Sequence, residues 1–351
     1  MSTTELTIVR PDDWHLHLRD GPQLASVVGF TAQRFGRAII MPNLNPPITT
    51  TPQALAYKAR ILAALPAATT FEPLMTLYLT DNTTPEIIAD AVASEAVYGV
   101  KLYPAGATTN SDSGVTNLAL CAPALETMAE LGLPLLVHGE VVDDAVDIFD
   151  REQVFVETVL APLLQRYPDL RVVLEHITTR QAVEFVRAAG DNVAATITPQ
   201  HLMFNRNALL AGGLRPHNYC LPVLKAERHR QAVVEAATDD HPRFFLGTDS
   251  APHAVSAKEN ACGCAGIFSA HAGIELYAEA FAAVGRLSRL EAFASLRGAD
   301  FYKLARNTET ITLEREDWRV PDALDFGAEL LVPFRAGETM HWRLRRETGS
   351  G

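Results

Sequence analysis

The sequence has few cysteines and no long apolar segment. No stretch is long and apolar enough to span a bilayer, and residues 1–10 show neither the basic cluster nor the apolar run of a secretory signal. We therefore expect a cytoplasmic protein. The cysteines are too few and too scattered for a disulfide scaffold, so we expect them to stay reduced. They are Cys121, Cys220, Cys262 and Cys264.

Basic residues are also in deficit, with 30 Lys and Arg against 42 Asp and Glu, a formal net charge of -12. Nucleic acids and anionic membranes bind basic surfaces, so this balance argues against both as partners. The negative charge does not exclude a small anionic substrate, because salt screens distant surface charge beyond about 10 Å.

Short apolar runs alternate with amphipathic segments along the 351 residues, a pattern typical of successive βα units around a parallel sheet. Eight strands are expected, one at His15 and the others at 38–41, 71–79, 100–103, 133–138, 171–176, 193–198 and 243–249. This count predicts an α/β fold, a (β/α)8 TIM barrel. We expect a single domain over residues 1–351, with the barrel at about 5–304 and a small C-terminal β or irregular extension at about 305–351. The polar segments 199–222 and 250–266 are expected to be functional loops.

Polar side chains recur where the expected strands end, which is where active sites of such barrels form. His15 and His17 alternate with Leu16 and so share one face of the first strand. Other strand ends carry Arg19, Asn43, Lys101, His138, His176 and Asp249. A hydrogen-bonded structural histidine explains any one of the four, but less readily all of them. Four histidines and a carboxylate exceed the needs of one tetrahedral zinc ion, so the set favours two metal ions with a shared ligand.

Lys101 is open to two interpretations. A protonated amine has no lone pair for a metal, so a salt bridge or a substrate-orienting charge is one role. Alternatively, carbon dioxide adds to the neutral amine and gives a carbamate, whose two oxygens can bridge two metal ions. The spacing of the residues does not decide between these roles.

Seven segments together resemble one family. They are PDDWHLHLRD (11–20), MPN (41–43), KLYP (101–104), VHGE (137–140), EHITT (175–179), ITPQHL (197–202) and GTDSAPH (247–253). In these the chain resembles the metal-dependent amidohydrolases, and within them the short bacterial branch that interconverts N-carbamoyl-L-aspartate and L-dihydroorotate in pyrimidine biosynthesis. The resemblance spans nearly the whole chain.

The resemblance implies a metal centre of two zinc ions per subunit. The residues that match the family's ligands are His15, His17, Lys101, His138, His176 and Asp249. The first two histidines and the aspartate would hold the more buried zinc, the other two histidines the second, and a carboxylated lysine (N6-carboxylysine) would bridge both. A hydroxide between the zinc ions would attack the ring amide carbonyl, with Asp249 as general base and then acid.

The resemblance also implies substrate contacts and a homodimer. The matching substrate-binding positions are His17, Arg19, Asn43, Thr108, Thr109, His138, Leu221, His253 and Ala265. Arg19 can offer two parallel N–H donors to the substrate carboxylate, with Asn43 and His253 beside it. Main-chain groups of Leu221 and Ala265 would bind the ring amides, and the two threonines would close over the substrate.

Two alternatives remain. A related enzyme of the hydantoin- or dihydropyrimidine-cleaving kind would use the same metals on a ring without a carboxylate, which leaves Arg19 without a partner. A non-catalytic barrel acting as a scaffold would be marked by lost ligands, and the sequence retains all of them.

Overall fold

Eight parallel strands form the centre of the computed structural model, which describes residues 4–345. They pair in chain order as β2 (Asp13–Leu16), β3 (Arg37–Ile40), β4 (Glu72–Tyr78), β5 (Val97–Leu102), β6 (Leu135–Val137), β7 (Val172–Leu174), β8 (Val193–Ile197) and β9 (Phe244–Leu246). The sheet closes where Asp249 N donates to His15 O at 2.9 Å and His17 N donates to Ser250 O at 3.1 Å. The (β/α)8 barrel expected from the sequence is confirmed.

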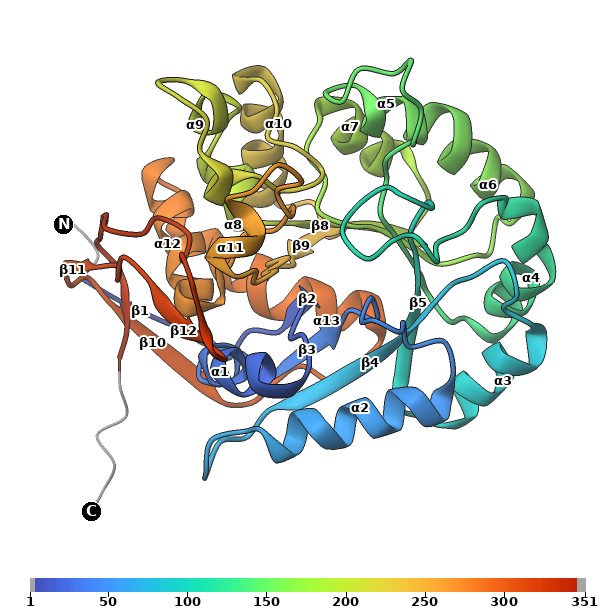
Figure 1. Cartoon of the computed structure of the whole chain (residues 1–351), viewed down its shortest axis with the longest axis horizontal. Helices are drawn as coiled ribbons and strands as arrows, with labels where there is room; N and C mark the ends of the chain where they lie inside the picture. The colour runs from blue at the N-terminus through green and yellow to red at the C-terminus, as the bar shows by residue number, and fades with distance from the viewer. Residues whose placement is uncertain (1–3, 346–351) are drawn as a thin grey trace.

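Helices surround the strands, as Figure 1 shows. The longer ones are α1 (Gly21–Ala32), α2 (Thr51–Ala63), α3 (Pro85–Ala93), α4 (Ala122–Leu131), α7 (Arg180–Ala188), α10 (Glu227–Thr238) and α12 (Gly273–Ala283). A π-helical turn, η2 (Val156–Leu160), joins α5 (Arg151–Phe155) to α6 (Ala161–Arg166), and η6 (Ala292–Leu296) leads in the same way into α13 (Arg297–Tyr302). Single 3-10 turns are η1 (Leu118–Cys121), η3 (Pro216–Asn218), η4 (Ala270–Ala272) and η5 (Leu287–Arg289).

Two segments differ from the sequence-based expectation. The helix expected over 81–97 begins only at Pro85, because proline favours the first helical turn and Thr83 Oγ1 instead accepts from Thr80 N in a turn at 3.0 Å. The segment 199–222, expected to be irregular, contains α8 (Pro199–Met203) and α9 (Asn207–Leu210). Thr198 caps α8 by accepting from His201 N, so a local capping signal creates this helix.

The alternation of side chains along the strands separates an inner core from an outer one. Along β5, Val100 and Leu102 pack outward against the helices, while Lys101 between them points into the barrel and is fully buried. The rest of the barrel interior is an apolar inner core that contains Trp14, Leu136 and Phe245. Strand periodicity therefore directs a lysine into the barrel interior.

The N-terminal strand belongs with the C-terminal extension. β1 (Glu5–Val9) pairs antiparallel with β10 (Thr310–Glu314), which pairs with β15 (Arg343–Leu344), and Figure 1 shows β1 and β10 side by side. Two further antiparallel pairs are β11 (Trp318–Arg319) with β14 (Thr339–Met340) and β12 (Leu324–Phe326) with β13 (Glu329–Leu331). The barrel range expected from about residue 5 thus includes a strand of another sheet. Residues 346–351 of the expected extension lie outside the described range.

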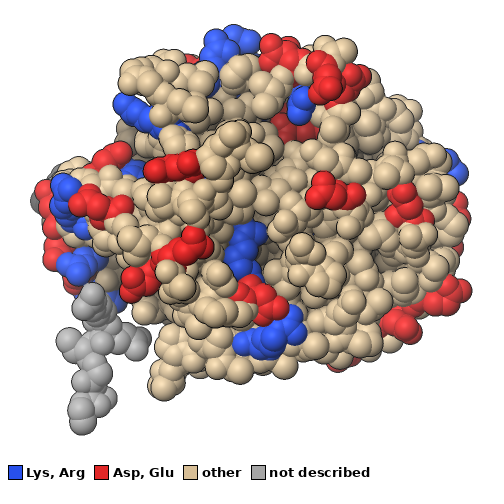
Figure 2. Space-filling view, in the orientation of Figure 1, with Lys and Arg blue, Asp and Glu red and all other residues tan. Residues whose placement is uncertain are grey.

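The surface and the helix lengths bear on possible partners. Figure 2 shows acidic and basic side chains interspersed over the face drawn, with some basic atoms in the hollow near its centre. Within residues 4–345, none of the helices combines the length and apolar character that a bilayer crossing requires.

Candidate active site

Three side chains from the two strands that close the barrel meet at one point. His15 lies on β2, His17 directly follows it, and Asp249 follows β9. Asp249 Oδ1 lies 3.3 Å from His15 Nε2 and 3.2 Å from His17 Nε2, and the two imidazole nitrogens lie 3.3 Å apart. The three residues are buried. Two nitrogens and one oxygen thus converge as a metal ion would require.

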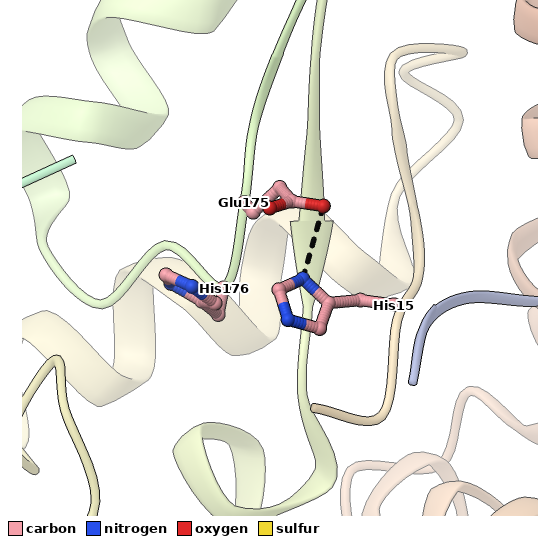
Figure 3. Close-up of side chains that lie close together, drawn as sticks. All are labelled: His15, Glu175 and His176. Carbon is pink, nitrogen blue, oxygen red and sulfur yellow. Dashed lines mark ion pairs between the residues drawn. The ribbon is translucent and has the colours of Figure 1, made fainter. Parts of the chain in front are cut away.

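A second group lies beside the first and includes a residue that the sequence-based prediction did not include. Glu175 Oε1 lies 3.0 Å from His15 Nδ1, and its other oxygen accepts from the ammonium group of Lys101. Figure 3 shows Glu175 and His176 side by side, with Glu175 directed at the His15 ring. The His176 ring centre is 5.0 Å from that of His15 and 4.9 Å from that of His138. All the predicted metal ligands therefore gather at one end of the barrel.

Backbone conformation explains why Glu175 was missed. In a regular strand, neighbouring residues point to opposite faces, so a strand that directs His176 inward would direct Glu175 outward. Alternation from Val173, which lies in the inner core, already directs Glu175 inward, and the φ of 43° at His176, in the left-handed region, turns the His176 side chain to the same side. Arg19 and Asp249 also have positive φ, 62° and 44°. Such strained positions in non-glycine residues concentrate at functional sites. The adjacency of Glu175 to His176 in the matched segment was the available signal.

The protonation of the cluster fits a cation site. Burial lowers the pKa of His17 to about 4 and that of His176 well below its ordinary value, so both rings are neutral, the form that binds metal. Burial also disfavours a charged His15, but the carboxylates of Glu175 and Asp249 raise the pKa of His15 to about 9. The carboxylates therefore attract positive charge to this point, which a proton or a metal ion can supply.

The surroundings of Lys101 are compatible with carboxylation. Burial lowers the pKa of the Lys101 amine, although Glu175 opposes this shift, and the side chain is 0% exposed. A lowered pKa favours the neutral amine that reacts with carbon dioxide. His176 Nδ1 is buried and has no hydrogen-bond partner among the described residues. The residues present therefore fit a two-metal centre with a modified lysine.

The substrate positions predicted from the resemblance surround a small inner cavity of about 20 Å³. Its walls include Arg19, Asn43, Thr108, Thr109, Leu221 and Ala265, with His15, His17, His138, His176 and Asp249. Lys101 lies beneath the cavity in the core, and His253 lines an adjoining outer cleft of about 710 Å³. The structure thus brings all of these predicted residues to one region, although His253 faces the outer cleft.

The wall between the two cavities is formed by Arg19 and the loop that carries the threonines. Arg19 Nη2 lies 3.0 Å from His253 Nε2, and Arg19 Nε donates to Pro252 O at 3.0 Å. Thr109 O accepts from Asn43 Nδ2, and Thr109 Oγ1 donates to Ala265 O, both at 3.4 Å. These long contacts hold the loop across the inner cavity.

Two buried carboxylates outside the cavity position its walls and were also missed. Asp13 accepts from Thr248 N at 2.8 Å, from Thr248 Oγ1 at 2.6 Å and from His15 N at 3.2 Å, so it joins the segments that carry His15 and Asp249. Burial raises the pKa of Asp13 to about 6. Glu152 on α5 accepts from the main-chain and hydroxyl groups of Thr178 and Thr179. The contacts with Thr248, Thr178 and Thr179 have no local sequence signal, because these partners are distant in the chain.

This arrangement is that of a metal-dependent hydrolase barrel, and a model of the amidohydrolase family matches residues 8–316. The chain belongs to the amidohydrolase family. It is 67% identical over 342 residues to a dihydroorotase of Nitrosomonas europaea, with 97% of this chain and 98% of that protein covered.

Solved structures of dihydroorotases are similar throughout. That from Campylobacter jejuni has a TM-score of 0.90 and 34% identity, with 99% of both chains covered. That from Saccharomyces cerevisiae, in complex with 5-fluoroorotic acid, has a TM-score of 0.89 and 33% identity, with 98% of this chain and 99% of that chain covered.

Proposed function

We propose that the chain is a dihydroorotase, which closes N-carbamoyl-L-aspartate to L-dihydroorotate and opens it again, a step of de novo pyrimidine (UMP) biosynthesis. The observation that carries this proposal is the 67% identity to a dihydroorotase over 97% of the chain. The site supports it, because metal-ligating side chains and an arginine line the same cavity.

His15, His17 and Asp249 would hold one zinc ion, and His138 and His176 a second. Bound zinc would polarise the amide carbonyl and make water a stronger nucleophile near neutral pH. Glu175 supports this assignment. Its contact with His15 Nδ1 leaves Nε2 of the ring directed at Asp249, as in metal sites where a carboxylate orients a ligating histidine.

The contact between Lys101 and Glu175 is compatible with carboxylation of the lysine. A carbamate keeps one N–H on Nζ, which could still donate to Glu175, and its two oxygens would add anionic metal-binding atoms. The lysine would then be an anion shared by both zinc ions. The salt-bridge interpretation describes the same contact before the modification.

Asp249 is the general base and acid in this proposal. Burial alone would raise its pKa, but His15 and His17 hold the pKa of Asp249 well below its ordinary value, so it is a carboxylate. In ring opening it would accept a proton from water and deliver it to the departing ring nitrogen. In ring closure it would take the proton from the attacking carbamoyl nitrogen.

Arg19, Asn43 and His253 would bind the substrate carboxylate, while main-chain groups of Leu221 and Ala265 bind the ring amides. Arg19 is half-buried at the cavity wall, where a carboxylate would supply the anionic partner that a guanidinium requires. The cavity of about 20 Å³ holds roughly one water molecule, so the loop with Thr108 and Thr109 must move to admit a ring and can then close over it.

Steady-state assays of the purified chain in both directions test this function. We expect turnover of L-dihydroorotate to exceed that of dihydrouracil and hydantoin, which lack the carboxylate, by about 10³-fold or more. Comparable rates on the rings without a carboxylate would favour the hydantoinase-like alternative, and no turnover of any ring would favour a scaffold. We also propose that the protein is cytoplasmic and forms a homodimer. Sedimentation of the purified chain would test the dimer.

A further inference from the structure

Lys258 is a buried lysine outside the cavity to which neither the metals nor the substrate gives a role. It ends the short helix α11 (Val255–Lys258), and 4% of the residue is exposed. Its ammonium group donates to three main-chain carbonyls, those of Tyr219 at 3.0 Å, Cys264 at 2.9 Å and Gly266 at 2.5 Å. An ammonium group has three N–H donors, so all of them are used.

The three carbonyls belong to two segments that form the cavity wall. Tyr219 lies two residues before Leu221, and Cys264 and Gly266 flank Ala265; Leu221, Ala265 and Gly266 line the inner cavity. One direct bond also joins the segments, since Gly266 N donates to Tyr219 O at 3.0 Å. Tyr219 O therefore accepts from both Gly266 and Lys258, and the lysine lies at the junction of the two segments.

Neighbouring contacts make the position of this wall matter for the cavity. A side chain at Gly266 would meet Ala251 O at 2.7 Å and the His253 ring at 2.7 Å, so the wall packs tightly against the residues next to Arg19. Ala265 O is also the acceptor for Thr109 Oγ1. A shift of the segment 264–266 would therefore change the contacts of His253, which lies beside Arg19, and of Thr109.

We propose that Lys258 is a positioning residue for substrate binding, which sets the distance between the Leu221 and Ala265 walls by holding both segments on one ammonium group. Lys258 is not among the residues that line either cavity. The inference deepens the proposed function and rests on it for the kinetic readout. Loss of the lysine should therefore weaken substrate binding while the chemical step and the metal centre persist.

The test compares Lys258→Ala with a matched control, Lys225→Ala. Lys225 is equally buried, 3% exposed, and within residues 4–345 its ammonium group donates only to Val223 O, in its own segment, at 2.8 Å; its charge also lowers the pKa of Glu152, so metal content is measured for this variant too. For Lys258→Ala we expect KM for N-carbamoyl-L-aspartate to rise about tenfold or more, because one or more hydrogen bonds to a cation are lost. We expect kcat to stay within about threefold of the parent value and the metal content to be unchanged. Added n-propylammonium, which replaces the missing side-chain atoms, should lower the KM of this variant and leave that of Lys225→Ala unchanged.

A KM within twofold of the parent, or equal effects of the two substitutions, would overturn the proposal. If Lys258→Ala does not fold, Lys258→Gln, which keeps two N–H donors on a shorter side chain, serves in its place with the same criterion. Hydrogen exchange separates this inference from the proposed function. Faster exchange of the Gly266 amide in the Lys258 variant, with the rest of the barrel unchanged, supports the positioning role even if the parent proves inactive on N-carbamoyl-L-aspartate. Unchanged exchange there contradicts it.

Discussion

Replacement of Glu152 by glutamine is expected to weaken both the barrel and the second metal position. Glu152 Oε2 accepts from Thr178 N and Thr178 Oγ1, both at 2.9 Å, and Oε1 accepts from Thr179 N at 2.8 Å and Thr179 Oγ1 at 2.5 Å. Thr178 lies two residues after His176. The carboxylate on α5 therefore fixes the segment that leads from β7 through His176.

The expected loss of unfolding free energy follows from the N–H and O–H groups that donate to Glu152. A glutamine oxygen in the place of Oε1 keeps both contacts with Thr179, and the Thr178 hydroxyl can rotate to accept from the new NH₂ group. Thr178 N then loses its 2.9 Å acceptor and keeps only the longer 3.1 Å contact with the Oε1 position, and the loss of a hydrogen bond to a charged group costs about 1.5–3 kcal/mol. Burial raises the pKa of Glu152, which means that the buried charge already carries a penalty that glutamine removes. We therefore expect a loss of about 1–2 kcal/mol of unfolding free energy.

Glu157→Gln is the matched control, because it makes the same chemical change in the adjoining π-helical turn at an exposed position. Urea unfolding followed by circular dichroism gives the stability of both variants, and competition with a chelator gives their zinc affinity. We expect Glu152→Gln alone to lower stability and to weaken zinc binding by up to about tenfold. Equal behaviour of the two variants would refute the role given to Glu152.

Three further predictions concern the reaction and the metals. Asp249→Asn should lower kcat by about 10³-fold or more with an unchanged circular dichroism spectrum, and near-parent activity would exclude Asp249 as the proton carrier. Arg19→Met should raise KM for L-dihydroorotate by about 10- to 100-fold, which corresponds to the loss of a charge-assisted hydrogen bond. The ratio of kcat/KM for L-dihydroorotate to that for dihydrouracil should also fall. An unchanged ratio would show that Arg19 does not bind the substrate carboxylate. Because the pKa of His15 is raised to about 9 in the metal-free cluster, a metal ion must displace a proton there below that pH. Apparent zinc affinity should therefore fall about tenfold per unit as pH falls from about 9 to 7, and a flat profile in a chelator titration would contradict this linkage.

Much of the barrel could be predicted because its signals are local. Apolar runs marked the strands, and alternation placed His15 and His17 on one face and turned Lys101 inward. The carboxyl ends of parallel strands meet at one end of a barrel, so strand order alone assigns residues far apart in the chain to one site.

The remaining features depend on contacts between distant segments or on unusual backbone geometry. The pairing of β1 with β10 has no signal in either strand alone. Glu175 points into the barrel by alternation from Val173, and His176 joins it because its φ of 43° interrupts that alternation. Lys258 has the sequence context of an ordinary polar loop residue, and its role emerges only from three carbonyls brought together by folding.

Metal removal and reconstitution test the central claim most directly. The purified chain should contain two zinc ions per subunit and cyclise N-carbamoyl-L-aspartate, and a chelator should abolish both properties. Activity should return on addition of zinc together with bicarbonate, the source of carbon dioxide for Lys101, and less completely with zinc alone. Full cyclisation activity in metal-free protein would contradict the account.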